Sequence, residues 1–271
     1  LAVVPVMLFH AGFELFGGGF VGVDVFFVIS GYLITTILIE DIENKRFSII
    51  NFYERRARRI LPALFLVIFA CMPFAWMWMD LSQMKDFSQS LVAVSLFASN
   101  ILFWTESGYF AGAAEEKPLL HTWSLAVEEQ YYLLFPIFLI LAWRFGKNRV
   151  FWIIVFMSIF SLILSEWGWR KDSIANFYLA PSRAWELFAG SIAAFIIQKH
   201  GVQKNNLLSL IGLTAIIFSI FAYDQNIPFP SIYTLVPVLG VTFVVLYAEK
   251  GTLVAKLLST KLFVGIGLIS Y

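Results

Sequence analysis

The chain has 271 residues, of which 60% are hydrophobic and only 14% are charged, and its formal net charge is +1. Soluble domains average about 45–50% apolar and about 25% charged residues, so the composition excludes a water-soluble globular fold. The near-neutral charge gives no reason to expect nucleic acid as a partner. A single cysteine, Cys71, excludes an intramolecular disulfide. We therefore predict an all-α integral membrane protein in contact with the lipid bilayer.

Apolar segments recur along the whole chain. A membrane-spanning helix needs about 20 mainly apolar residues. Ten segments are candidates: Leu1–Phe9, Phe20–Ile39, Ile60–Met79, Phe87–Trp104, Leu119–Trp143, Val150–Trp167, Ala184–Ile197, Leu207–Tyr223, Ile232–Ala248 and Leu262–Tyr271. We expect a polytopic transmembrane helix bundle that forms a single domain over residues 1–271. Because both ends of the chain lie in apolar runs, we expect this domain to be incomplete at both termini.

The positions of Lys and Arg predict how the segments are oriented. If all ten segments cross, the basic residues show no bias toward either side of the membrane. If Phe87–Trp104 does not cross, loops 40–59, 144–149, 198–206 and 249–261 share the cytoplasmic side and hold 14 of the 19 basic residues. This segment also carries several Ser, Gln and Asn side chains. We therefore expect it to be re-entrant or interfacial.

The first polar constellation connects the first two segments. His10 follows the first apolar run, and Asp24 stands inside the otherwise apolar run Val23–Ile29. An ionised aspartate in a membrane helix costs roughly 2.5–3.5 kcal/mol, so such a residue usually faces a partner in the protein interior. The alternative is that both residues lie at the membrane interface, where Asp24 anchors a helix end.

A basic block precedes the third segment and contains Arg55, Arg56, Arg58 and Arg59. One interpretation is a positive anchor that contacts anionic lipid headgroups. The other is an anion site, because guanidinium groups bind phosphate through two parallel hydrogen bonds. Several guanidinium groups together would suit the polyphosphate of coenzyme A.

Two further constellations follow at helical spacing. Successive residues of a helix are about 100° apart around its axis. Four polar side chains, an imidazole, a hydroxyl, a carboxylate and a phenol, therefore fall within about 60° of one another on one helix face. These groups belong to His121, Ser124, Glu128 and Tyr132, whereas Glu129 points about 100° away from Glu128. Arg183 and Glu186 are three residues apart and are expected to pair on one helix face, or to anchor a helix start. The histidines lack metal-binding spacing, and no metal site is predicted.

Four sequence blocks carry a family resemblance: GFVGVDVFFVISGYLI at 19–34, FYERRARRILP at 52–62, PLLHTWSLAVEEQYYLLFP at 118–136 and RAWELFAG at 183–190. In this order they resemble the membrane-bound acyltransferase family 3, the OafA-type O-acetylases, essentially from end to end. The resemblance implies a multi-pass protein of the bacterial inner membrane. It also implies transfer of an acyl group, usually acetyl, from cytoplasmic acyl-coenzyme A to an extracytoplasmic glycan such as O-antigen or peptidoglycan. The family's usual helix count favours a crossing Phe87–Trp104, against the charge argument.

The resemblance also implies roles for individual residues. His10 matches the histidine of the family's Arg-x10-His motif, whose arginine would lie before Leu1. We expect His10 to be the catalytic base, with Asp24 orienting it or sharing its proton, and an acyl-histidine intermediate is a variant of this scheme. The donor, acetyl-coenzyme A, would be bound by Arg55, Arg56, Arg58 and Arg59, with no bound cofactor. The substrate path would be lined by His121, Ser124, Glu128, Tyr132, Arg183 and Glu186.

Two other function classes compete with acyl transfer. In a transporter, the acidic and basic side chains inside the membrane would form a proton or substrate pathway. The chain shows no obvious internal repeat, which disfavours this class. A membrane glycosyltransferase that uses a lipid-linked sugar would share only the arginine block.

Overall fold

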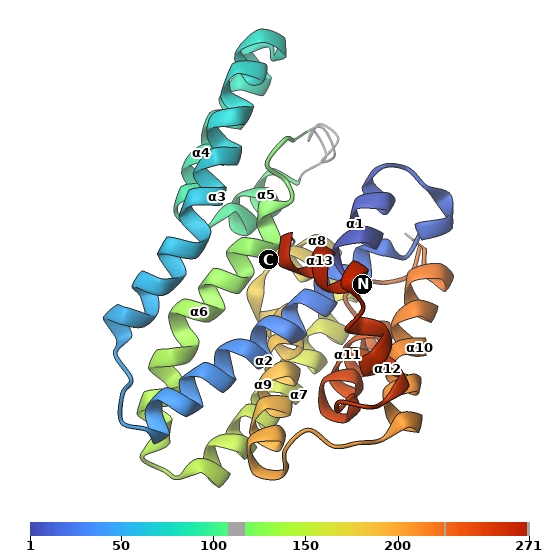
Figure 1. The fold of residues 1–271 in the computed structure, drawn as a ribbon. Coiled ribbons are helices and arrows are strands. Elements are labelled where there is room, and N and C mark those ends of the chain that lie inside the picture. Colours follow the sequence, from blue (N-terminus) through green and yellow to red (C-terminus); the bar gives the residue numbers. More distant parts are fainter. Residues whose placement is uncertain (108–116, 225, 270–271) are drawn as a thin grey trace. The chain divides into compact units, whose positions relative to one another are not determined.

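The computed structural model describes residues 1–107, 117–224 and 226–269, which form helices and no strand. The helices are α1 Val3–His10, α2 Gly22–Glu43, α3 Ile49–Trp78, α4 Leu81–Ser95, α5 Ser99–Glu106, α6 Thr122–Trp143, α7 Lys147–Lys171, α8 Ser173–Tyr178, α9 Ala180–His200, α10 Asn206–Ala222, α11 Leu235–Tyr247, α12 Leu253–Leu258 and α13 Lys261–Ile269 (Figure 1). The short 3₁₀ helices are η1 Glu14–Phe16, η2 Gly19–Val21 and η4 Ile232–Thr234. The all-α prediction is confirmed.

Within the described ranges, four helices are long and apolar enough to cross a membrane: Gly19–Glu43, Ile49–Trp78, Thr122–Trp143 and Lys147–Lys171. Two shorter apolar helices, Asn206–Ala222 and Ile232–Tyr247, accompany them. The predicted number of ten segments stays a prediction, and the end of Leu262–Tyr271 lies outside the described residues. The third helix begins at Ile49 rather than Ile60, so the basic block forms its first turns.

The chain divides into two compact units. The first contains Leu1–Ile37, Ala142–Phe177 and Pro181–Tyr271, and the second contains Leu38–Leu141 and Tyr178–Ala180. In the second unit, α3 and α4 pack through an apolar cluster that includes Leu64, Ile68, Phe87 and Val94.

The segment Phe87–Trp104 is not one straight helix. It contains the end of α4 and most of α5, with a break at residues 96–98, where Phe97 has a φ of 52°. Asn100 is buried and forms a hydrogen bond through its Oδ1 with Gln130 Nε2 at 2.9 Å. The polar residues of this segment therefore attach α5 to α6. That the segment is re-entrant or interfacial stays a prediction.

In the first unit, α2 and α9 cross at two glycines. A Cβ added at Gly31 would lie 1.9 Å from the carbonyl oxygen of Leu187, and one at Gly190 would lie 2.0 Å from that of Val28. Small residues allow such close helix contact in a membrane, where packing replaces the hydrophobic effect as the driving force. This contact brings the start of α9 beside the start of α2, and it positions the polar cluster described next.

Candidate functional site

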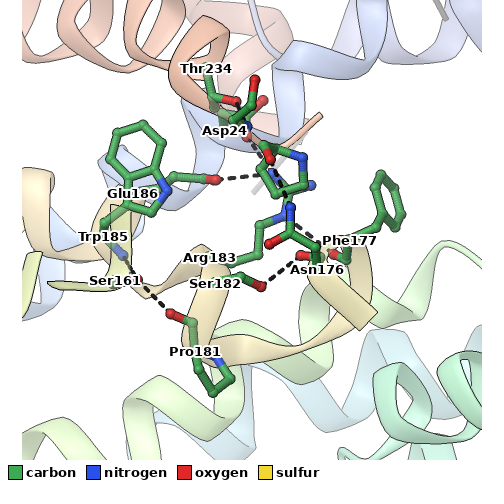
Figure 2. A network of polar contacts seen from close by, with 12 residues as sticks. Asp24, Ser161, Asn176, Phe177, Pro181, Ser182, Arg183, Trp185, Glu186 and Thr234 are labelled. Atoms are coloured by element: carbon green, nitrogen blue, oxygen red, sulfur yellow. Dashed lines mark hydrogen bonds and ion pairs between the residues drawn. The ribbon is translucent and has the colours of Figure 1, made fainter. Parts of the chain in front are cut away.

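A buried ion-pair cluster lies at the α2–α9 contact of the first unit. Arg183, in the first turn of α9, donates through Nη1 to Asp24 Oδ1 at 2.8 Å and to Glu186 Oε1 at 3.0 Å. The exposed fraction of these side chains is 1% for the arginine and 0% for both acids. Figure 2 shows the three side chains converging. The structure thus brings three of the predicted site residues together, including the predicted Arg183–Glu186 pair.

Aromatic rings surround the guanidinium group. Arg183 Cζ lies 5.8 Å from the ring centroid of Phe27 and 5.2 Å from those of Phe177 and Phe229. Arg183 Nε also donates to the carbonyl oxygen of Phe177 at 3.3 Å. A cation–π contact is worth about 2 kcal/mol when the cation is desolvated. These contacts offset part of the free-energy cost of removing the charge from water.

Two carboxyl groups share this one guanidinium. Asp24 Oδ2 and Glu186 Oε2 are buried and meet no hydrogen-bond partner among the described residues. With both acids ionised, the three side chains would carry one net negative charge, and an uncompensated buried charge is strongly destabilising. The charge balance of the cluster therefore depends on Arg183.

Further hydrogen bonds hold the start of α9 (Figure 2). Ser182 Oγ donates to the carbonyl oxygen of Asn176 at 2.6 Å, and Asn176 Nδ2 donates to that of Pro230 at 2.7 Å. Ser161 Oγ, on α7, accepts from the backbone N–H of Trp185 at 3.0 Å. Sequence reasoning missed these residues, because an isolated Ser or Asn in an apolar run carries no signal of the contact it makes in the fold.

The second unit contains a pocket of about 240 Å³ that is lined by α3, by α6 and by Leu96 and Phe97 between α4 and α5. Its polar lining residues are Tyr53, Arg56, Glu129, Gln130 and Tyr132. Arg56 Cζ lies 5.2 Å from the ring centroid of Tyr132. Glu129 Oε1 is buried and has no hydrogen-bond partner within the described ranges. The pocket thus offers a cation, an aromatic face and an unsatisfied carboxylate oxygen to a polar ligand.

The four arginines of the basic block do not share one environment. Arg56 lines the pocket. Arg55 forms an ion pair with Asp41 at 3.1 Å, and its side chain is 59% exposed. Arg58 forms an ion pair with Glu54, one turn earlier on α3, at 2.7 Å, and its side chain is 78% exposed. Arg59 is also exposed. Exposed ion pairs of this kind contribute about 0–1 kcal/mol, so the side chains of Arg55 and Arg58 are held weakly.

The predicted polar face of α6 is only partly at the pocket. His121 lies in the turn before the helix begins, where its carbonyl oxygen accepts from Ser124 Oγ at 3.2 Å. Tyr132 is buried and lines the pocket. Glu129 lines the pocket as well. Glu128 is half-buried and does not line it. The sequence analysis placed Glu128, not Glu129, on the functional face. Two adjacent glutamates point in different directions from a helix, so the pair itself indicated that one of them could face inward.

His10 is the last residue of α1 and is exposed. Its Nδ1 lies 2.8 Å from the carbonyl oxygen of Val6. A carbonyl oxygen only accepts, so Nδ1 carries the proton in this contact, and in the neutral ring Nε2 holds the lone pair. Asp24 forms its ion pair with Arg183 instead. The prediction that Asp24 orients His10 therefore has no contact in support and stays a prediction.

Metal binding has no support within residues 1–107, 117–224 and 226–269. No group of three His, Cys, Asp or Glu side chains in these ranges is positioned to hold a metal ion. The polar groups at the pocket are a guanidinium, an amide, two phenols and the carboxylate of Glu129, and the guanidinium is the group suited to an organic anion.

Comparison with known proteins places the chain in a family. Residues 2–271 match the model of acyltransferase family 3, which is described as an acyltransferase domain. The chain is 36% identical over 231 residues to an uncharacterized protein of Haemophilus influenzae, covering 79% of this chain and 93% of that protein. It is 30% identical over 292 residues to the peptidoglycan O-acetyltransferase OatA of Listeria monocytogenes, covering 100% of this chain and 46% of that protein.

An O-acetyltransferase OatA of Staphylococcus aureus is likewise 30% identical over 288 residues, covering 100% of this chain and 47% of that protein. The chain thus spans about half the length of the OatA relatives. No solved structure matches it. Because the family match extends over essentially the whole chain, which also has the apolar helices of a membrane protein, the chain belongs to the membrane-bound acyltransferase family 3.

Proposed function

We propose that the protein transfers an acetyl group from acetyl-coenzyme A to a hydroxyl of a glycan outside the bacterial inner membrane, with His10 as the base. The relatives named OatA are O-acetyltransferases, and one is named for peptidoglycan. Peptidoglycan is therefore our first candidate acceptor, and the O-antigen of lipopolysaccharide is the second.

The observation that carries this proposal is the hydrogen bond from His10 Nδ1 to Val6. It holds the ring in the tautomer whose basic nitrogen is Nε2, and the side chain is exposed, so an acceptor hydroxyl has access to it. An imidazole whose lone pair lies on an accessible nitrogen can take the proton of a hydroxyl as a general base.

The pocket at Arg56 supports a donor site. A guanidinium group binds phosphate through parallel hydrogen bonds, and here it is half-buried beside the ring of Tyr132. We expect Arg56 to hold a phosphate of coenzyme A, while the exposed Arg55, Arg58 and Arg59 attract the polyanion toward it.

The chemistry balances without a further reactant. His10 Nε2 takes the proton of the acceptor hydroxyl, whose oxygen attacks the thioester carbonyl carbon. The carbon–sulfur bond breaks, the thiolate leaves, and it takes up the proton held by His10. In the variant scheme Nε2 itself attacks the thioester, and the acyl-histidine then passes the acetyl group to the hydroxyl.

The test uses the full-length protein in proteoliposomes with labelled acetyl-coenzyme A and a glycan acceptor. We expect label in the glycan and an equal amount of free thiol. His10→Ala should lower the rate roughly 10²–10⁴-fold, which is the usual contribution of a general base. The control is Met7→Ala, one turn earlier on α1 and 65% exposed, which should keep the rate.

Two outcomes would overturn the proposal. A His10→Ala protein that transfers acetyl at the normal rate would refute the role of the histidine as base. Movement of a substrate across the membrane without release of thiol would favour the transporter class, in which the buried Asp24, Arg183 and Glu186 form a pathway.

A further inference from the structure

The pocket at Arg56 contains one carboxylate that the acyl-transfer scheme does not use. Glu129 lines the pocket from α6, whereas Arg56 lines it from α3. Glu129 Oε1 is buried, and no described residue donates a hydrogen bond to it. Because buried polar atoms nearly always have a partner, an open acceptor at a pocket indicates a ligand that carries a hydrogen-bond donor.

Two other polar side chains of the pocket are already engaged within the protein. Tyr53 donates through its hydroxyl to a backbone carbonyl oxygen of α6 at 2.8 Å. Gln130 Nε2 donates to the carbonyl oxygen of Phe97 at 3.0 Å and to Asn100 Oδ1 at 2.9 Å, which uses both of its N–H groups. These bonds hold the wall of the pocket. The guanidinium and the carboxylate are the two charged groups of the lining.

These two groups define what a ligand must carry. A ligand that enters the pocket displaces water from both of them. The guanidinium then needs an anion, and it fits phosphate through two parallel hydrogen bonds. The carboxylate oxygen needs a donor, since a buried acceptor without a partner weakens binding. The pocket volume of about 240 Å³ lies below the roughly 300–1,000 Å³ of pockets that enclose a whole small molecule, so it suits the end of a larger one.

Coenzyme A carries this pair of groups on its ribose. Its 3′-phosphate is a terminal monoester, and the free 2′-hydroxyl is on the neighbouring carbon. The diphosphate lies within the chain of the molecule and has no hydroxyl so close to it. We propose, resting on the proposed function, that Arg56 binds the 3′-phosphate and that Glu129 accepts a hydrogen bond from the 2′-hydroxyl. Acidic side chains accept from a ribose hydroxyl in dinucleotide-binding sites in the same way.

The experiment measures binding and does not depend on acyl transfer. The full-length protein in neutral detergent micelles is titrated with coenzyme A, 3′-dephospho-coenzyme A and 2′-deoxy-coenzyme A by isothermal titration calorimetry. The wild type should bind coenzyme A roughly 10–100-fold more tightly than either analogue, because each analogue loses a hydrogen bond to a charged group.

Each variant should abolish one preference and keep the other. Arg56→Gln should bind coenzyme A and the 3′-dephospho form about equally, and it should still discriminate against the 2′-deoxy form. Glu129→Leu should show the reverse, and Glu129→Gln, which keeps an acceptor oxygen, should recover part of the preference for the hydroxyl. Each preference is a ratio within one variant, so partial loss of folded protein does not change it. The control, Glu40→Leu, removes an exposed acid of the second unit outside the pocket and should keep both preferences.

The outcomes separate this proposal from the proposed function. An Arg56→Gln protein that still prefers the 3′-phosphate, or a Glu129→Leu protein that still prefers the 2′-hydroxyl, would overturn the assignment of that residue. A wild type that binds all three compounds equally would overturn the ribose subsite while keeping a donor site. A wild type that binds none of them would refute the donor site as well. Binding with the expected preferences, but without acetyl transfer to a glycan, would refute the proposed function alone.

Discussion

Arg183 is the residue on which the polar interior of the first unit depends. It is almost fully buried, it pairs with Asp24 and Glu186, and three aromatic rings surround it. A buried charge is retained only where its partners are held in place, and here hydrogen bonds around the start of α9 hold them. The cluster connects α2 to α9 through side chains that are 159 residues apart in sequence.

Removal of the arginine should be far more costly than removal of one acid. Arg183→Met leaves two buried carboxyl groups without a cation and should lower the free energy of unfolding by about 3–5 kcal/mol. Glu186→Gln keeps the Asp24–Arg183 ion pair and removes the excess negative charge, so its effect should be much smaller. Denaturant unfolding in mild detergent micelles measures both.

Arg170 offers the control for that comparison. It pairs with Glu166 one turn earlier on α7, and its side chain is 53% exposed. Arg170→Met should therefore change the free energy of unfolding by no more than about 1 kcal/mol. A loss for Arg183→Met no larger than that for Arg170→Met would contradict the role assigned to the buried cluster.

At the level of helices, glycine decides how closely α2 and α9 approach. The backbone of α9 occupies the space that a Cβ at Gly31 would need, and the backbone of α2 occupies the space that a Cβ at Gly190 would need. Without these contacts Arg183 would not reach Asp24 across the two helices. Gly190 in RAWELFAG and Gly31 in VISGYLI therefore have a packing role that neither block reveals when it is read alone.

Gly190→Ala should destabilise the protein. A methyl group would lie 2.0 Å from the carbonyl oxygen of Val28, so the two helices must separate. Overpacking of this kind costs about 1–3 kcal/mol, which exceeds the roughly 1 kcal/mol that alanine gains over glycine in a helix. The midpoint of thermal unfolding in micelles should therefore fall.

Gly265→Ala is the matched control, because nothing lies within 4 Å of a Cβ at this position of α13. It should leave the midpoint unchanged or raise it slightly, since only helix propensity changes. If Gly190→Ala behaved like Gly265→Ala, the close crossing of α2 and α9 would be refuted.

At the level of the whole chain, basic loops gather at one end of the first unit. Lys147 and Asn148 of loop 144–149 line one groove together with Lys199 and His200 of loop 198–206. Loop 198–206 in turn contacts the end of α11, where Gln203 N–H donates to the carbonyl oxygen of Leu246 at 2.8 Å, and the start of α12, where Leu253 N–H donates to Asn206 Oδ1 at 3.0 Å. Three of the four basic loops predicted to share the cytoplasmic side therefore lie together. Their assignment to that side stays a prediction.

Single cysteines test that assignment. In a Cys71→Ser background, Arg46→Cys, Arg144→Cys, Lys204→Cys and Lys250→Cys each place one thiol in one of the four basic loops. A membrane-impermeant maleimide should leave all four unlabelled in intact cells and label all four after the membrane is permeabilised. Lys117→Cys, between Phe87–Trp104 and Leu119–Trp143, should be labelled in intact cells. Labelling of any of the four loop thiols from outside would refute the shared side.

The outline of this protein follows from sequence alone. Composition predicts a membrane protein because so much apolar surface requires lipid, and the spacing of Arg183 and Glu186 predicts their pairing because helix geometry is local. The polar residues of Phe87–Trp104 were informative too, although they attach α5 to α6 instead of simply marking a weak membrane segment.

Other features depend on which helices meet. Helix periodicity determines which residues share a face, but it does not determine which face meets another helix. For this reason the sequence did not distinguish Glu129 from Glu128 at the pocket, or Arg56 from the rest of its block. The same limit applies to Asp24: that it orients His10 stays a prediction, and its pairing with Arg183 depends on the close approach of α2 and α9. Contacts between distant segments arise from packing, and no local pattern encodes them.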